Sequence, residues 1–325
     1  MGLLIKYLVI LIFSILITYI SLLLGNKINI LDNPSSEKIH DVPIPRTGGI
    51  ALFFSFLITN ILFSKILSIY ELSFLFFIFL IGLIDDLISI PQRLKLAIEI
   101  ILSLILFIVY PFHFIGIYVL DILFAIFYLV GSINSFNIID GMDGLAAGIA
   151  IIAFSFLYIY SGNIVLLVAI ICAGFLVWNF HKAKIFMGDS GSLFLGALIG
   201  LISLRVLKEH PRPNTVITLI FIYAIPIYDS ALSIMRRLEN WKELFKPDIE
   251  HFYNKLYRKT NNYVGTVILI YIFSIILSLI GIGLYNAKTV VSLSAGLIIW
   301  TFMFFVGYKL GFIGGKDGKH TDVSA

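Results

Sequence analysis

Long apolar runs separated by short polar connections recur along the whole chain. Each run is typical of a membrane span, because about twenty apolar residues cross a bilayer as a helix. The fold class is therefore predicted to be all-α: a polytopic integral membrane protein with about eleven transmembrane helices, formed by residues 1–325 as one domain. These helices are expected at residues 3–25, 47–64, 70–84, 95–110, 117–133, 145–161, 163–178, 192–207, 215–234, 263–284 and 288–308.

The composition supports this class. Hydrophobic residues make up 60% of the chain and charged residues 13%, a balance that soluble globular proteins do not have. The chain is expected to contact the lipid bilayer and no nucleic acid. Its one cysteine, Cys172, lies inside an apolar run, so it can form neither an intrachain disulfide nor a thiolate metal cluster.

Charge predicts the orientation of the helices. If the N-terminus lies outside the cell, most of the 23 lysines and arginines fall in the connections on the inner side. The connections that are rich in polar motifs fall on that same side. Their convergence predicts an active site that opens to the cytoplasm.

The densest polar stretch covers residues 134–145, between two apolar runs. Asn134, Asn137, Asp140 and Asp143 recur every three residues, so on a helical path they form one oxygen-rich stripe. Such groups are costly to bury in hydrocarbon unless they line a hydrated site. The alternative is a loop with ordinary helix caps.

Two further acidic motifs carry candidate chemistry. Asp85 and Asp86 end an apolar run side by side, where neighbouring carboxylates repel unless a cation or a shared proton intervenes. Asp189 lies in a glycine-flanked turn just before a predicted helix, and a helix N-terminus attracts anions. A divalent cation would let this acid share the turn with phosphate. Plain helix caps remain the alternative for both motifs.

The predicted inner loops thus combine acids with carboxamides, Asn179 among them. Oxygen ligands of this kind favour Mg²⁺, with Mn²⁺ as the alternative, whereas the histidines are too scattered for zinc. Acids, a divalent cation and phosphate-binding cations indicate phosphoryl transfer onto a lipid. The candidate cations, each of which could instead be a positive-inside anchor, are Lys38, Arg46, Lys95, Arg236 and Arg237.

Four motifs between about Lys38 and His251 resemble those of one family. The chain is similar to the polyprenyl-phosphate N-acetylhexosamine-1-phosphate transferases of glycosyltransferase family 4. This superfamily includes the bacterial translocase of peptidoglycan synthesis and enzymes that start O-antigen and teichoic acid linkage. The motifs are Lys38-x-His-x-x-Pro-x-Pro-Arg-x-Gly-Gly49, Asp85-Asp86 with Lys95, Asn134-x-x-Asn-x-x-Asp-Gly-x-Asp-Gly-Leu145, and Asn179 with Ala183-Lys-Ile-Phe-Met-Gly-Asp-Ser-Gly-Ser192.

The resemblance implies a reaction and its partners. A polyprenyl phosphate acceptor attacks the β-phosphorus of a UDP-N-acetylhexosamine donor, which gives polyprenyl-diphospho-sugar and UMP. This is the first membrane step of a cell-envelope polysaccharide, an O-antigen or a wall polymer. A homodimer is a further expectation from the family.

The resemblance also implies roles for residues. Asn137 and Asp189 would hold magnesium, and Asp85 and Asp86 would lie near the lipid phosphate, one of them as a candidate base. The remaining substrate-binding positions are Lys38 and Lys95 for phosphates, Asp143 for the uracil, Phe186 stacked on it, and Asn134, Asp140 and Asn179 around them.

One loop departs from the pattern. Many members carry His-x-His-His here, whereas this chain keeps His251 and has Tyr253 and Asn254 in place of the other two histidines. The loop is similar to that of members that start O-antigens with 6-deoxy-N-acetylhexosamines. His251, three residues after Asp248, is expected to act at the diphosphate, and a surface histidine is the alternative.

Two other classes compete with the transferase. Gly188-Asp-Ser-Gly191 also fits the turn of rhomboid-like intramembrane serine proteases, which would need a histidine facing Ser190. An ion-coupled transporter is suggested by Glu99, Asp121 and Asp229, which lie in or beside apolar runs.

Overall fold

The computed structural model describes residues 2–34, 41–63, 67–239 and 250–312. Within these ranges the chain is all-α apart from two two-residue strands, which confirms the predicted fold class. The elements are α1 (Leu3–Ile28), β1 (Leu31–Asp32), β2 (Ile44–Pro45), α2 (Gly48–Phe63), α3 (Ile69–Ile88), α4 (Gln92–Val109), α5 (Tyr118–Ile139), α6 (Leu145–Ser161), α7 (Asn163–Asn179), α8 (Gly188–Glu209), α9 (Pro213–Ile222), α10 (Ala224–Glu239), α11 (Phe252–Thr260), α12 (Tyr263–Tyr285) and α13 (Thr289–Lys309).

Helix α8 is the centre of the bundle. An 18-residue window of it is 94% buried, and α2, α3, α5 and α6 pack around it. A helix that is apolar on all sides can be stable in this way only when other helices cover all its faces. The first turn of α8 lies at one end of the bundle, among the ends of α2, α3, α5 and α6. The candidate site lies at this end.

The outer helices expose apolar side chains. Helix α13 presents Val290 and Leu297, which are 77% and 71% exposed, and α12 presents Phe273, which is 51% exposed. Among the described residues, five helices are long and apolar enough to cross a membrane, or six when a bent pair is counted as one span. Three shorter apolar helices accompany them. The protein is thus a multi-pass membrane protein, and the expected number of eleven crossings stays a prediction.

One expected helix is wrong. The run over 215–234 forms two helices, α9 and α10, which meet at Tyr223 with a bend of 82°. Pro226 explains the break, because its ring clashes with the carbonyl four residues earlier, that of Ile222, and it has no N–H to donate. Ile222 is accordingly the last residue of α9.

Other boundaries also differ from expectation. Helix α8 begins at Gly188 and not near 192, so Asp189 belongs to its first turn. Helix α3 extends from Ile69 to Ile88, longer than expected, with a capping box between Ser68 and Glu71 at its start. Helix α11 and the β1–β2 pair were not expected from the sequence.

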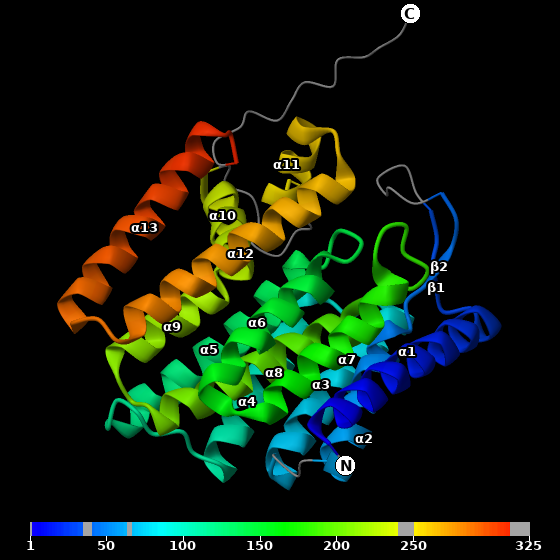
Figure 1. Cartoon of the computed structure of the whole chain (residues 1–325), viewed down its shortest axis with the longest axis horizontal. Helices are drawn as coiled ribbons and strands as arrows, with labels where there is room; N and C mark the ends of the chain where they lie inside the picture. Colours follow the sequence, from blue (N-terminus) through cyan, green and yellow to red (C-terminus); the bar gives the residue numbers. More distant parts are fainter. Residues whose placement is uncertain (1, 35–40, 64–66, 240–249, 313–325) are drawn as a thin grey trace, which may run out of the picture.

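The polar connections gather at one end of the bundle. Figure 1 shows the loops at 140–144 and 180–187 and the β1–β2 pair side by side at this end, with α11 above them. Backbone bonds join them: the N–H of Phe186 donates to the carbonyl of Pro45 at 2.8 Å, and the N–H of Gly48 donates to the carbonyl of Phe186 at 3.0 Å. Motifs far apart in the sequence thus form one surface.

Candidate functional site

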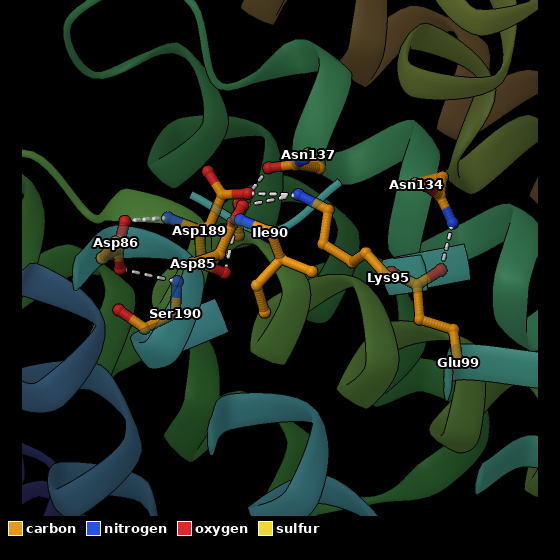
Figure 2. Close-up of polar contacts among 10 residues, drawn as sticks. Asp85, Asp86, Ile90, Lys95, Glu99, Asn134, Asn137, Asp189 and Ser190 are labelled. Carbon is orange, nitrogen blue, oxygen red and sulfur yellow. Dashed lines mark hydrogen bonds and ion pairs between the residues drawn. The ribbon is translucent and has the colours of Figure 1, made fainter. Parts of the chain in front are cut away.

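The centre of the site is a lysine between two aspartates. The buried Nζ of Lys95 lies 2.8 Å from Oδ2 of Asp85 and 2.5 Å from Oδ2 of Asp189 (Figure 2). Asp85 also accepts the backbone N–H of Ile90, which follows the end of α3. The three charged groups come from α3, α4 and α8, so only the folded bundle brings them together.

Asp86 binds the N-terminus of α8. Its Oδ1 accepts the N–H of Asp189 at 2.8 Å and its Oδ2 accepts the N–H of Ser190 at 3.0 Å. These N–H groups have no partner within the helix, and the helix dipole favours a negative charge there. Two of the N–H groups that were expected to face phosphate are therefore, in this structure, bonded to the carboxylate of Asp86.

Helices α3 and α8 approach each other very closely beneath these acids. A Cβ atom added to Gly82 would lie 2.4 Å from the carbonyl oxygen of Asp189 and 2.5 Å from Cα of Ser190. No side chain fits such a gap, so glycine is required at this position. The close approach lets Asp86, one turn further along α3, reach the first turn of α8.

The two asparagines of α5 face different neighbours. The side-chain oxygen of Asn137 accepts the hydroxyl of Ser192 at 2.6 Å, which fastens it to α8. The amide of Asn134 donates to Glu99 of α4, whose side chain is fully buried (Figure 2). The predicted stripe therefore divides: Asn137 lies at the acidic cluster, whereas Asn134 secures α4 against α5.

Asp140 lies just beyond the end of α5. Burial, and after it the negative charges of Asp189 and Asp86, raise the pKa of Asp140 to about 8, against an opposing effect of Arg46. Neighbouring carboxylates repel one another unless a positive charge lies close to them. Asp140 thus completes a cluster that a divalent cation would stabilise.

Asp143 connects this cluster to the next loop. Its Oδ2 accepts the N–H of Ala183 at 3.0 Å and lies 3.2 Å from Nδ1 of His181. The ring of His181 stacks on Tyr263, with centroids 4.4 Å apart. Tyr263 in turn accepts the backbone N–H of Asp143. Sequence reasoning missed His181 and Tyr263, since a single histidine and a single tyrosine at a helix end give no distinctive pattern.

Asn179 braces the two motif loops from below. Its amide donates to the carbonyl of Ile185 at 2.9 Å, and its side-chain oxygen accepts the N–H of Gly144 at 3.1 Å. The residue is 3% exposed. Asn179 therefore holds the loops in this structure, and its expected contact with substrate stays a prediction.

The remaining predicted residues lie around this centre. Phe186 is half-buried at the start of the α8 motif, and Arg46 pairs with Asp32 at 2.7 Å. Lys38, predicted to bind phosphate, lies outside the described residues.

His251 lies at the start of α11, where a buried acid holds it. Its Nδ1 is 2.9 Å from Oδ2 of Asp229, a residue of α10 with no solvent exposure. Its ring stacks on Tyr253, with centroids 5.2 Å apart. The contact between Asp229 and His251 was not predicted, because in the sequence Asp229 is only an isolated acid in an apolar run.

The rival classes find no support in these contacts. In the part of the chain that the structure describes, the buried hydroxyl of Ser190 donates to the carbonyl of Met187 at 3.5 Å, and no histidine is bonded to it. The acids proposed for ion transport have separate local partners: Asn134 for Glu99, the backbone of Phe114 and Ile115 for Asp121, and His251 for Asp229. They form no shared path.

The side chains at the acidic cluster offer oxygen donors for a metal ion. Among the described residues, no group of three or more His, Cys, Asp or Glu side chains is arranged to hold a metal ion. The Asp189 carboxylate, the Asn137 carboxamide and the adjacent Asp140 nevertheless provide the oxygen donors that Mg²⁺ takes when phosphates and water complete its shell. The nearby charges of Asp189 and Asp86, which add to the effect of burial on the pKa of Asp140, are charges that such an ion would offset. The residues present therefore fit a magnesium ion that the substrate helps to bind.

Comparison with known proteins identifies the family. A profile described as glycosyl transferase family 4 matches residues 68–207, which include the Asp85, Asn137 and Asp189 motifs. A probable undecaprenyl-phosphate N-acetylglucosaminyl 1-phosphate transferase of Bacillus subtilis (strain 168) is 31% identical over 96% of this chain and 93% of its own. The chain belongs to glycosyl transferase family 4.

Two further relatives have related names. An undecaprenyl-phosphate alpha-N-acetylglucosaminyl 1-phosphate transferase of Thermotoga maritima is 33% identical over 84% of this chain and 88% of its own. A phospho-N-acetylmuramoyl-pentapeptide-transferase of Borreliella afzelii is 33% identical over 55% of this chain and 65% of its own. The predicted family is confirmed, and this family 4 protein is a membrane-embedded transferase; the protease and the transporter are set aside.

Proposed function

We propose that this enzyme transfers an N-acetylhexosamine 1-phosphate from its UDP-sugar to polyprenyl phosphate, which releases UMP and starts an envelope polysaccharide. The observation that carries the proposal is the cluster of Asp85, Asp189 and Lys95 at the first turn of the buried helix α8. An acidic cluster with a bound ammonium, at the end of a membrane bundle, suits a lipid phosphate and a nucleotide diphosphate. The names of the relatives support both substrates.

The bond changes follow from the substrates. An oxygen of the lipid phosphate forms a bond to the β-phosphorus of the donor, and the bond from that phosphorus to the bridging oxygen breaks. The electron pair leaves with that oxygen, on UMP. A phosphate monoester is largely ionised at neutral pH. The lipid phosphate therefore needs correct positioning against the β-phosphorus more than it needs a base to remove a proton.

We assign magnesium binding to Asp189 and Asn137, with Asp140 beside them. When bound with the donor, the ion would neutralise negative charge on the diphosphate. The protein residues orient and shield the reactants: Lys95 holds Asp189 in place, and Asp86 fixes the first turn of α8 through two backbone bonds. Asp85, which Lys95 also holds, is the acid best suited to face the lipid phosphate.

We assign the uracil to the loop pair around Asp143 and Phe186. Oδ2 of Asp143 is held by His181 and Ala183, and we assign Oδ1 as the acceptor of the N–H of the uracil ring. His181 and Tyr263 keep this carboxylate in position through the contacts described above. Phe186 offers an aromatic face for stacking.

The site is expected to face the cytoplasm, because the positive-inside rule places most basic connections on that side. Lys182 is exposed at the site end and Lys288 at the opposite end. In a Cys172→Ala background, a membrane-impermeant maleimide applied outside intact cells should label Lys288→Cys and spare Lys182→Cys. The reverse pattern would invert the orientation.

The reaction itself is tested in proteoliposomes. The purified protein should release UMP from a UDP-N-acetylhexosamine only when undecaprenyl phosphate and Mg²⁺ are both present. A panel of UDP-N-acetylglucosamine and 6-deoxy-N-acetylhexosamine donors identifies the sugar, which the loop with Tyr253 and Asn254 leaves open between the two groups. Absence of lipid-dependent UMP release with every donor would reject the proposal.

A further inference from the structure

A buried acid that the proposed reaction does not use lies behind His251. Asp229 of α10 is fully buried, and both of its carboxylate oxygens are occupied. Oδ2 lies 2.9 Å from Nδ1 of His251, and Oδ1 accepts the N–H of Phe252 at 3.0 Å. Phe252 is the first residue of α11, so one carboxylate fixes both the imidazole and the start of that helix.

These contacts determine which ring nitrogen remains for a ligand. Because Asp229 accepts the backbone N–H of Phe252 through Oδ1, we take its Oδ2 as an acceptor too, which assigns the donated proton to Nδ1 of His251. Nε2 is then the nitrogen left to meet a substrate group. In the described part of the chain, the ring of His251 is hydrogen-bonded through Nδ1.

A second set of contacts leads from the ring of His251 through Tyr253 to the end of α5, next to Asn137. It stacks almost parallel on Tyr253, with an interplanar angle of 5°. The hydroxyl of Tyr253 donates to the carbonyl of Ile138 at 3.2 Å, directly after Asn137. A Cβ on Gly141 would lie 2.0 Å from that hydroxyl, so glycine makes room for the tyrosine.

This arrangement gives Tyr253 a role of its own. The position holds a histidine in many members of the resembling family, and here the longer side chain reaches from α11 to the loop that follows α5. The chain of contacts from Asp229 through His251 and Tyr253 therefore joins α10, α11 and the end of α5. The bend between α9 and α10 leaves α10 beside α11 (Figure 1).

We propose that Asp229 is a positioning residue that fixes the His251 imidazole with Nε2 directed to the diphosphate of the donor. The inference rests on the proposed transferase function. Asp229 touches no reacting atom and acts only through His251 and the start of α11. A substitution that removes the charge of Asp229, or one of its two hydrogen bonds, releases the His251 imidazole from this orientation.

The first test is a double-mutant cycle on Asp229→Asn and His251→Ala, in the UMP-release assay with the donor that the wild type uses. Asparagine has one oxygen for two donors, so it cannot keep both bonds. We expect Asp229→Asn to lower kcat/KM for the donor about tenfold to a hundredfold, with KM for polyprenyl phosphate unchanged. The double variant should be no slower than His251→Ala alone.

Asp121→Asn is the matched control. Asp121 is also a buried aspartate that accepts backbone N–H groups, from Phe114 and Ile115, and lies 3.4 Å from a histidine, His113. It lies at the other end of α5, roughly 28 Å from Asp140 at 1.5 Å per helical residue. Its substitution should leave kcat/KM for the donor unchanged.

A second pair of variants does not depend on the folding of Asp229→Asn. The amide nitrogen of glutamine can occupy the place of Nε2, and that of asparagine the place of Nδ1. His251→Gln should therefore retain more activity than His251→Asn. The opposite order, or single losses that multiply in the Asp229→Asn/His251→Ala double variant, would overturn the positioning role. An inactive wild type would instead overturn the proposed function.

Discussion

Buried acids have different partners at the two ends of the helix bundle. At the far end, Glu71 accepts the N–H of Ser68 at 2.7 Å and lies 3.5 Å from Arg205. Asp121 at that end accepts the N–H of Ile115 at 2.7 Å. Each of these acids has its own partners and stabilises a helix start or a loop.

At the site end, the four acids Asp85, Asp86, Asp140 and Asp189 share few cations. Asp85 and Asp189 are bound by one lysine, Lys95, and burial together with the negative charges of Asp189 and Asp86 raises the pKa of Asp140. Repulsion of this kind opposes folding, so it persists where binding of a cation or a substrate relieves it. The comparison teaches that uncompensated charge distinguishes the functional end from the structural end.

The largest expected effect is that of Asp189→Asn. The change removes one negative charge from the centre of the cluster and weakens magnesium binding, so turnover should fall about a thousandfold or more. The measurement is the rate of UMP release at saturating substrates. Asp121→Asn, at the far end, should retain the wild-type rate, and full activity in Asp189→Asn would remove the metal assignment.

Lys95→Met should come next. Methionine keeps much of the volume but leaves Asp85 and Asp189 facing each other without a cation, so kcat/KM should fall about a hundredfold and the apparent melting temperature should drop. Arg93→Met, an exposed change at the start of the same helix, is the control. Equal effects of the two variants would mean that α4 contributes only general positive charge.

Asp143→Ala separates the nucleotide side of the site from the lipid side. Loss of the carboxylate should raise KM for the UDP-sugar about tenfold and leave KM for polyprenyl phosphate nearly unchanged, because a lost charged hydrogen bond costs about 1.5–3 kcal/mol. Steady-state kinetics with each substrate varied in turn measures both. A larger effect on the lipid would show that the uracil pocket is misplaced.

The smallest effect concerns pH. The pKa of Asp140 lies at about 8 instead of the ordinary 3.8, so the folded protein holds a proton that the unfolded chain releases between these values. Without Mg²⁺, this group therefore lowers stability as pH rises from about 4 to about 8.

Magnesium should reverse this trend, because a cation favours the charged carboxylate. Its affinity should rise several-fold between about pH 6.5 and 8.5, and Asp140→Asn should flatten the dependence. Thermal-shift titrations with MgCl₂ at several pH values measure both. An unchanged pH dependence in Asp140→Asn would assign the effect to another group.

Much of the fold followed from local patterns. The lengths of the apolar runs predicted ten of the helices, although the observed ends differ from the predicted ones. Run length carries this signal because a membrane span must satisfy its own backbone hydrogen bonds in lipid. The bend at Tyr223 was missed although Pro226 marks it, because hydropathy alone does not register a lost N–H. Helix α11, short and polar, has no apolar signal to reveal it.

The sequence by itself determined the membrane class and the family, and it singled out the acids that meet at one end of the bundle, because residue type and spacing are local properties that the motifs preserve. Only the tertiary structure decided which acid meets which partner. Asp86 binding α8, Lys95 between Asp85 and Asp189, and Asp229 behind His251 each join segments that are distant in sequence. Such pairings depend on how helices pack around α8, and no spacing along one chain encodes them.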